Sequence, residues 1–209
     1  MNGDIILDGP FDEKRYSQAC PRIVWVLKQD SSQWGADEKN YRQRFMGAFQ
    51  EHQIQTSPTW RKLAYASYGL HNAGVEYDLL PDANFCAEHY MMQTAIVESA
   101  KELADTTFSD DVQVLDGFRR HEELVLRQIK DLAPDIVIVC MGGGLREIPE
   151  KIARMFGVES WQIRTGNCWG SLTSGGNKLL WSYHPSYPRI GDREFYQSIC
   201  ECAEGLLQY

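Results

Sequence analysis

The stretch Lys178-Leu179-Leu180-Trp181-Ser182-Tyr183-His184-Pro185-Ser186-Tyr187-Pro188-Arg189-Ile190-Gly191 decides the fold and the candidate site. Its first half is apolar and aromatic, which is typical of a buried strand. Pro185 and Pro188 cannot donate to a sheet ladder, so the strand must end before them. The stretch therefore predicts His184 at the carboxyl end of a strand, where open α/β sheets bind ligands. An ordinary loop histidine is the alternative interpretation.

Three further apolar runs predict strands at Ile23–Leu27, Met91–Val97 and Ile136–Cys140. Helical periodicity occurs over residues 37–70 and 118–132, from Ile148 to Phe156, and from Asp192 to about Leu207. Strands that alternate with helices indicate a parallel sheet covered on both faces. We therefore expect a single α/β domain over residues 1–209, built as a three-layer α/β/α structure around a central, mainly parallel four-stranded sheet.

The connecting segments carry weaker signals. Residues 1–20 are polar and mixed, and indicate a peripheral arm or helix. Residues 71–90 are rich in turn-forming residues and residues 105–113 are acidic, so both are expected to be loops. Residues 158–177 contain several glycines and predict a short hairpin or a loop.

Composition limits the classes of function. The chain has 209 residues, 43% of them apolar, and a formal charge of −8, which argues against broad attraction to nucleic acid. It contains no run long enough to span a bilayer and no basic leader, so we expect a soluble intracellular protein, cytoplasmic or, in a eukaryote, nuclear, with no membrane partner. The six cysteines form no Cys-x-x-Cys pair and the histidines no i, i+4 pair, so no metal site is expected.

Four predicted strand ends carry the candidate chemistry, and parallel strands bring their carboxyl ends to one edge of the sheet. They are Gln29-Asp30-Ser31, Glu98-Ser99, Gly142-Gly143-Gly144 and His184-Pro185-Ser186. An aspartate such as Asp30 can orient and partly deprotonate water, and His184 can donate a hydrogen bond to an anionic leaving group. Glu98 could accept hydrogen bonds from a base or ribose, or be a surface glutamate or a partner of Lys101. The triple glycine could bring backbone N–H groups to a phosphate, or form a tight turn.

These residues resemble the uracil-DNA glycosylase superfamily. The segment from Leu180 to Ser186, with Tyr187-Pro188 after it, is similar to the family's strand that ends in His-Pro-Ser. Val26-Leu27-Lys28-Gln29-Asp30 is similar to the strand that ends in Gly-Gln-Asp-Pro, and Leu124–Gly144 resembles the helix, strand and glycine turn that precede a helix in that family. Thr94–Glu98 occupies the place of the strand that ends in a base-reading asparagine.

The resemblance implies hydrolysis of an N-glycosidic bond to a nucleobase in DNA or in a smaller nucleotide, without a cofactor. It implies that Asp30 positions water, that His184 supports the departing base, and that Ser186, Tyr187 and Arg189 contact DNA. Base flipping would expose the bond, which stacked duplex shields. The substrate-binding residues implied are Gln29, Ser31, Glu98, Gly143 and Ser186. Trp34 and Tyr65 are candidates for stacking on the base, and a core role for Tyr65 is the alternative.

Three positions differ from the family pattern. Lys28 replaces the first glycine, Ser31 replaces the proline and Glu98 replaces the asparagine. A carboxylate only accepts hydrogen bonds, whereas a uracil edge presents both a donor and an acceptor. The sequence therefore does not specify which base is recognised. Because fold does not fix function, a non-catalytic nucleic-acid- or nucleotide-binding protein on the same scaffold is an alternative, and an unrelated hydrolase or transferase with a Rossmann-like sheet is another.

Overall fold

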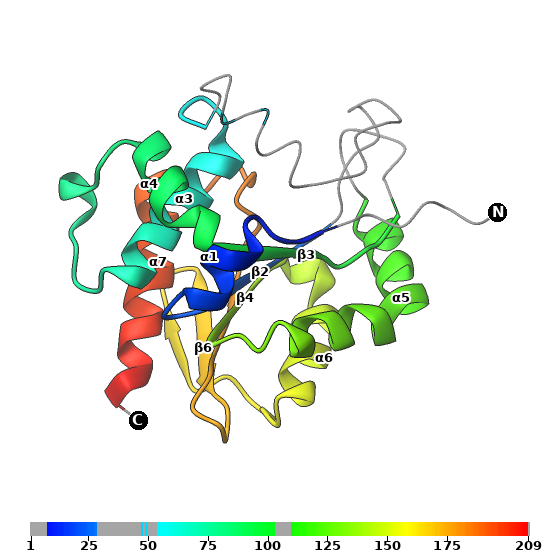
Figure 1. The fold of residues 1–209 in the computed structure, drawn as a ribbon. Coiled ribbons are helices and arrows are strands. Elements are labelled where there is room, and N and C mark those ends of the chain that lie inside the picture. Colours follow the sequence, from blue (N-terminus) through cyan, green and yellow to red (C-terminus); the bar gives the residue numbers. More distant parts are fainter. Residues whose placement is uncertain (1–7, 29–46, 48, 50–53, 103–109, 209) are drawn as a thin grey trace.

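The computed structural model describes residues 8–28, 47, 49, 54–102 and 110–208, and these form an α/β structure around one sheet (Figure 1). Seven strands of this sheet are described, in the order β1-β3-β2-β4-β7-β6-β5. Their bounds are Gly9–Pro10 (β1), Ile23–Leu27 (β2), Thr94–Glu98 (β3), Ile136–Cys140 (β4), Ile163–Thr165 (β5), Cys168–Leu172 (β6) and Lys178–Ser182 (β7).

The four strands predicted from apolar runs form the parallel centre of this sheet. Strand β2 pairs in parallel with β3 and β4, and β4 pairs in parallel with β7. The expected count of four strands was wrong, because β1, β6 and β5 extend the sheet with antiparallel pairs. The segment at residues 158–177 is therefore part of the sheet: β5 and β6 form a hairpin, and all five residues of β6 pair with β7. Gly166, with a φ of +53°, occupies the hairpin turn, where a left-handed backbone favours glycine.

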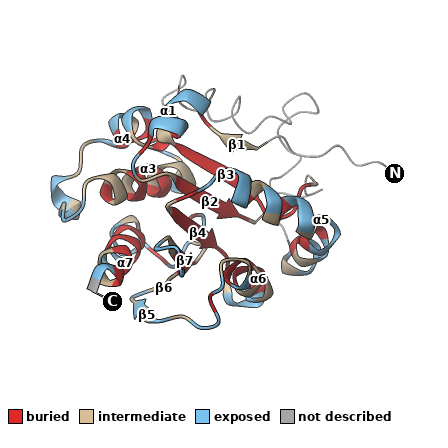
Figure 2. Cartoon of the chain, turned by 60° about the horizontal axis from the view of Figure 1, so that its bottom comes forward, coloured by how far each residue is buried: buried red, intermediate tan, exposed pale blue. Residues whose placement is uncertain are grey.

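Helices cover both faces of the sheet, as expected for a three-layer arrangement (Figure 2). They are α1 (Glu13–Gln18), α3 (Pro58–His71), α4 (Ala83–His89), α5 (Asp111–Asp131), α6 (Glu147–Met155) and α7 (Asp192–Gly205). Short 3₁₀ turns lie at Tyr77–Leu79, Met91–Gln93, Gly143–Leu145 and Leu206–Gln208.

Alternate side chains of each central strand enter two separate cores. In β2, Ile23 and Trp25 belong to the first core, together with residues of α3, α4 and α7. Val24 and Val26 belong to the second core, with residues of α5 and α6. Both sets are fully buried, which is why these strands read as continuous apolar runs in the sequence.

Several predicted boundaries were wrong. The segment 71–90 contains α4, whose N-cap residue Asp82 accepts hydrogen bonds from the backbone N–H groups of Asn84 and Phe85. Helix α5 begins at Asp111, not at residue 118, after the N-cap Asp110. Strand β3 begins at Thr94, because Met91–Gln93 forms a 3₁₀ turn. Within the described ranges, none of the helices has the length and apolar content that a membrane span requires.

Candidate functional site

The loop after β7 consists of two consecutive turns. The N–H of Tyr187 donates to the carbonyl of His184 at 2.9 Å, and the N–H of Ile190 donates to the carbonyl of Tyr187 at 3.4 Å. Each turn has a proline in its second position, where the fixed φ of proline is preferred. The sequence His-Pro-Ser-Tyr-Pro-Arg-Ile therefore encodes the turns directly, and His184 begins the first of them.

Ser186 fixes the orientation and the tautomer of the His184 ring. The backbone N–H of Ser186 donates to Nδ1 of His184 at 3.2 Å, and the Ser186 hydroxyl lies 2.7 Å from the same nitrogen. A backbone N–H can only donate, so Nδ1 accepts. The proton of the neutral imidazole consequently resides on Nε2, which makes that nitrogen a hydrogen-bond donor.

His184 is held neutral by its surroundings. Burial lowers the pKa of His184 to about 3, and the positive charges of Lys28 and Lys62 add to the effect. The side chain keeps some solvent contact, and at pH 7 it is an uncharged donor. A neutral donor of this kind is suited to stabilise negative charge that develops on a leaving group.

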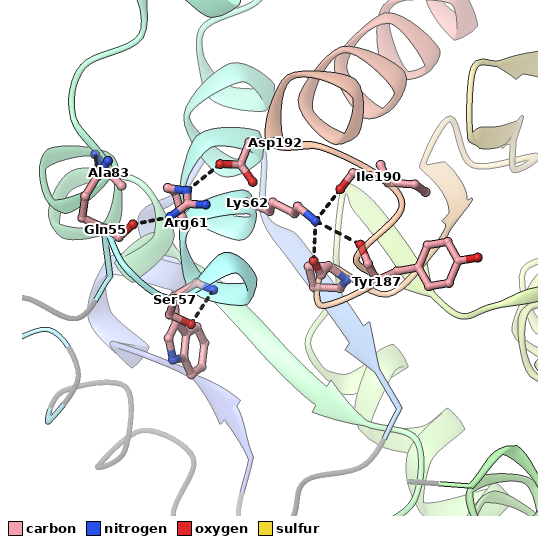
Figure 3. A network of polar contacts seen from close by, with 10 residues as sticks. Gln55, Ser57, Arg61, Lys62, Ala83, Tyr187, Ile190 and Asp192 are labelled. Atoms are coloured by element: carbon pink, nitrogen blue, oxygen red, sulfur yellow. Dashed lines mark hydrogen bonds and ion pairs between the residues drawn. The ribbon is translucent and has the colours of Figure 1, made fainter. Parts of the chain in front are cut away.

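Lys62, on α3, binds the backbone of the loop that carries His184. Lys62 is only 3% exposed. Its ammonium group donates to three backbone carbonyls, those of Pro185 at 2.8 Å, Ile190 at 2.7 Å and Tyr187 at 3.3 Å (Figure 3). Burial lowers the pKa of Lys62, and Asp192 partly opposes this shift. A single buried side chain thus ties both turns of the loop to α3.

The neighbouring residue, Arg61, joins α3 to the start of α7. Its Nε lies 2.5 Å from a carboxylate oxygen of Asp192, in the first turn of α7 (Figure 3). The side chain of Ser57 caps α3 by accepting a hydrogen bond from the N–H of Trp60, and Pro58 follows at the first helical position. Ser57 is therefore the N-cap of α3, within the segment 37–70 for which the sequence predicts helix.

The ends of β2 and β4 meet at the start of α5. The Lys28 ammonium, directly after β2, lies 2.8 Å from Oδ1 of Asp111, the first residue of α5. A Cβ on Gly144 would collide with the same Asp111 carboxylate, so the glycine turn after β4 packs closely against this ion pair. Lys28 and Asp111 therefore connect two of the four predicted strand ends.

The ends of β2 and β3 are joined by hydrogen bonds to the Lys28 carbonyl. It accepts from the hydroxyl of Ser99 at 2.5 Å and from the N–H of Ala100 at 3.1 Å. Glu98, the last residue of β3, is 2% exposed, which excludes the surface interpretation. Lys101 binds Asp8 and Gln128, both at 2.6 Å.

The predicted site residues are distributed as follows. Asp30, Gln29, Ser31 and Trp34 lie outside the described residues. A Cβ at Gly143 would project into open space, so the turn after β4 does not require glycine at this position. It does require glycine at Gly144, where a Cβ would collide with Asp111. Arg189 is exposed, and Tyr187 stacks on Tyr183 with ring centroids 5.1 Å apart.

Glu98 and His184 are at the same sheet edge but on strands separated by β2 and β4. Three strand spacings correspond to roughly 14 Å. Tyr65 contacts Tyr77 edge to face and packs against the first core, which agrees with the core role for this residue.

Two residues of the site were missed by sequence reasoning. Lys62 could have been found, because it falls on the buried face of α3 together with Leu63 and Ala66, where a lysine needs partners. Asp111 gave no signal, since it stands in an acidic segment that reads as a loop.

The described residues contain no cluster of three or more His, Cys, Asp or Glu side chains that could hold a metal ion. Comparison with protein-family models finds no match, and neither does a search of curated proteins.

Proposed function

We propose that the protein hydrolyses the N-glycosidic bond of a nucleobase, in DNA or in a smaller nucleotide, on a uracil-DNA glycosylase-like version of the α/β fold. The observation that carries the proposal is the hydrogen bond from the Ser186 N–H to Nδ1 of His184. It leaves Nε2–H as a neutral donor at the carboxyl edge of a parallel sheet, where ligands bind in such folds.

The chemistry of the reaction matches this donor. Cleavage of the glycosidic bond moves an electron pair onto the departing base, and a hydrogen bond from Nε2 stabilises the oxygen or nitrogen that becomes negative. The cations of Lys28 and Lys62, which lower the pKa of His184, lower the energy of that anion as well. In the proposal Asp30 orients the water that attacks the sugar.

Base release from labelled oligonucleotides that contain uracil, hypoxanthine or a mismatch, and from free deoxynucleosides, tests the proposal. We expect the wild type to release one of these bases, and His184→Ala and Asp30→Asn each to lower the rate at least about 100-fold. His89→Ala, at an exposed histidine that ends α4, is the matched control and should retain the wild-type rate.

Unchanged release by His184→Ala would contradict the proposal. Tight binding of oligonucleotides or nucleosides without any release would instead identify a non-catalytic nucleic-acid- or nucleotide-binding protein on the same scaffold.

A further inference from the structure

A pocket of about 610 Å³ lies between α6 and strands β6 and β7, outside the His184 loop. Three tryptophans, Trp161, Trp169 and Trp181, form its apolar wall, and Arg146 and Arg154 line its other side. The volume falls within the roughly 300–1,000 Å³ that is typical of ligand sites.

The register of the sheet explains why the aromatic rings gather there. Arg164 of β5 is directly opposite Trp169 of β6, which is directly opposite Trp181 of β7. Directly paired residues share a face of the sheet, and here it is the face of the second core. The rings of Trp169 and Trp181 are stacked at 4.7 Å, and the Arg164 guanidinium lies 4.8 Å from the Trp169 ring.

The three tryptophans of the pocket differ in exposure. Trp181 is 7% exposed, whereas Trp169 and Trp161 are half-buried. The Trp169 ring lies between the Trp181 ring and the Arg164 guanidinium, so Trp161 is the tryptophan of the pocket that can stack on a ligand. The Trp161 ring lies 5.8 Å from that of Trp181 and is tilted by 42°, so the two rings form a wedge. Accessible aromatic surface in a hollow of this size is typical of a binding site.

Trp169, in the pocket wall, contacts the His184 loop through Tyr183, while Tyr183 and Tyr187 themselves lie outside the pocket lining and pack against the first core. Trp169 lies 6.4 Å from Tyr183, between ring centroids, and Tyr183 stacks on Tyr187 at 5.1 Å. These two tyrosines flank His184 in the sequence. We call the row formed by Trp161, Trp181, Trp169, Tyr183 and Tyr187 the aromatic row.

We propose that the tryptophan pocket and the aromatic row bind single-stranded nucleic acid that continues from the nucleotide at His184, an inference that rests on the proposed function. Unpaired bases expose π-faces that stack on aromatic side chains, whereas in a duplex the neighbouring bases cover them. An unpaired target also avoids the cost of extruding a base from a duplex. Arg146 and Arg154 can meet backbone phosphates.

The charge of the protein agrees with binding by stacking. The formal charge is −8, and Glu150 and Glu159 offset part of the arginine charge that lines the pocket. Few phosphates are then neutralised, so affinity should depend weakly on salt, with a log–log slope of about −1.4 for about two phosphate contacts to a single strand.

Fluorescence anisotropy with a 5′-labelled oligothymidylate tests the inference, because this strand contains no base that the enzyme is proposed to release. Tryptophan emission of the unlabelled complex gives a second readout. We expect the single strand to bind at least ten-fold more tightly than the matching duplex, and Trp161→Ala to weaken binding by about 5- to 100-fold. Phe85→Ala, at an exposed aromatic residue on α4, is the control and should bind as the wild type does.

Arg154→Glu is the second variant, should Trp161→Ala fail to fold, and we expect it to weaken binding as well. Equal affinity for duplex and single strand, or unchanged binding by the folded Trp161→Ala protein, would overturn the inference. Release of a base from a free deoxynucleoside without oligonucleotide binding would end this inference and support the proposed function. Trp161-dependent single-strand binding without release from any substrate would support the inference and end the proposed catalysis.

Discussion

The ammonium nitrogen of Lys62 lies 2.8 Å from the carbonyl oxygen of Pro185, a residue 123 positions later in the chain. The same nitrogen lies 2.7 Å from the carbonyl oxygen of Ile190. The conformation of the His184 loop is thus specified twice, locally by two prolines and remotely by one buried cation.

Lys62→Met should destabilise the protein by about 2–4 kcal/mol, because each buried acceptor that loses its donor costs about 1–3 kcal/mol and relief of the buried charge offsets part of the loss. Chemical denaturation measures the free energy of unfolding. Lys151→Met is the matched control: Lys151 pairs with Glu122 at a half-exposed position, and such a pair contributes at most about 1 kcal/mol. Equal losses for the two variants would show that Lys62 does not hold the loop.

The imidazole of His184 should stay neutral down to about pH 4, since its pKa in the folded protein is about 3, whereas histidine in an unfolded chain titrates near pH 6.5. The unfolded state therefore binds the proton first as the pH falls. Stability from the neutral ring is fully present above about pH 6.5 and is lost progressively between about pH 6.5 and pH 3.

NMR titration of the His184 ring measures this directly. His184→Gln removes the ionisable group, so the unfolding free energy of the wild type, relative to this variant, should rise between about pH 4 and pH 7. A midpoint near pH 6.5 for His184 in the folded protein would contradict the neutral-donor assignment.

Alanine should be tolerated at Gly143 and disruptive at Gly144. A Cβ at Gly143 meets open space, whereas one at Gly144 collides with the Asp111 carboxylate that binds Lys28. Crowding of this kind costs about 1–3 kcal/mol. Thermal unfolding of the two variants makes the comparison, and a Gly144→Ala protein as stable as Gly143→Ala would show that Asp111 moves aside without cost.

Asp8→Ala should destabilise the protein by about 3–5 kcal/mol, because it leaves a buried ammonium without its carboxylate. The side chains of Lys101 and Asp8 are only 1% and 2% exposed, and Gln128 hydrogen-bonds to both. The control is Glu123→Ala, which breaks an exposed pair with Arg127 and should change stability by less than about 0.5 kcal/mol. Similar unfolding midpoints for the two variants would argue against a structural role for the buried pair.

The elements that the sequence predicts correctly are those whose residues are buried on both faces. Strands β2 and β4 have the expected bounds, since every position in them is apolar and enclosed. Strand β6, Cys168–Leu172, has mixed polarity and is stabilised by pairing with β7, which no local pattern reveals. Helix α4 has only seven residues, too few for a clear helical periodicity, and its N-cap residue Asp82 is the sequence signal for it.

The site divides in the same way. His184 was predicted at a strand end because two prolines mark the boundary, and the structure agrees. The ion pair between Lys28 and Asp111 joins residues 83 positions apart, and the Lys62 contacts join residues more than 120 apart. Such contacts arise from tertiary packing, so neither periodicity nor motif spacing specifies them.

Strand β2 lies between β3 and β4, both of which follow it in the chain, and the loop that carries His184 is braced by a lysine from the helix between β2 and β3. During synthesis, the earliest central strand emerges from the ribosome before either of its neighbours exists. The His184 loop emerges after all the central strands and packs against α3, which has already been synthesised. Neither half of the polypeptide holds the complete site, so truncated or split versions should lose it altogether, and recombining two fragments should restore the site only when the sheet itself reassembles.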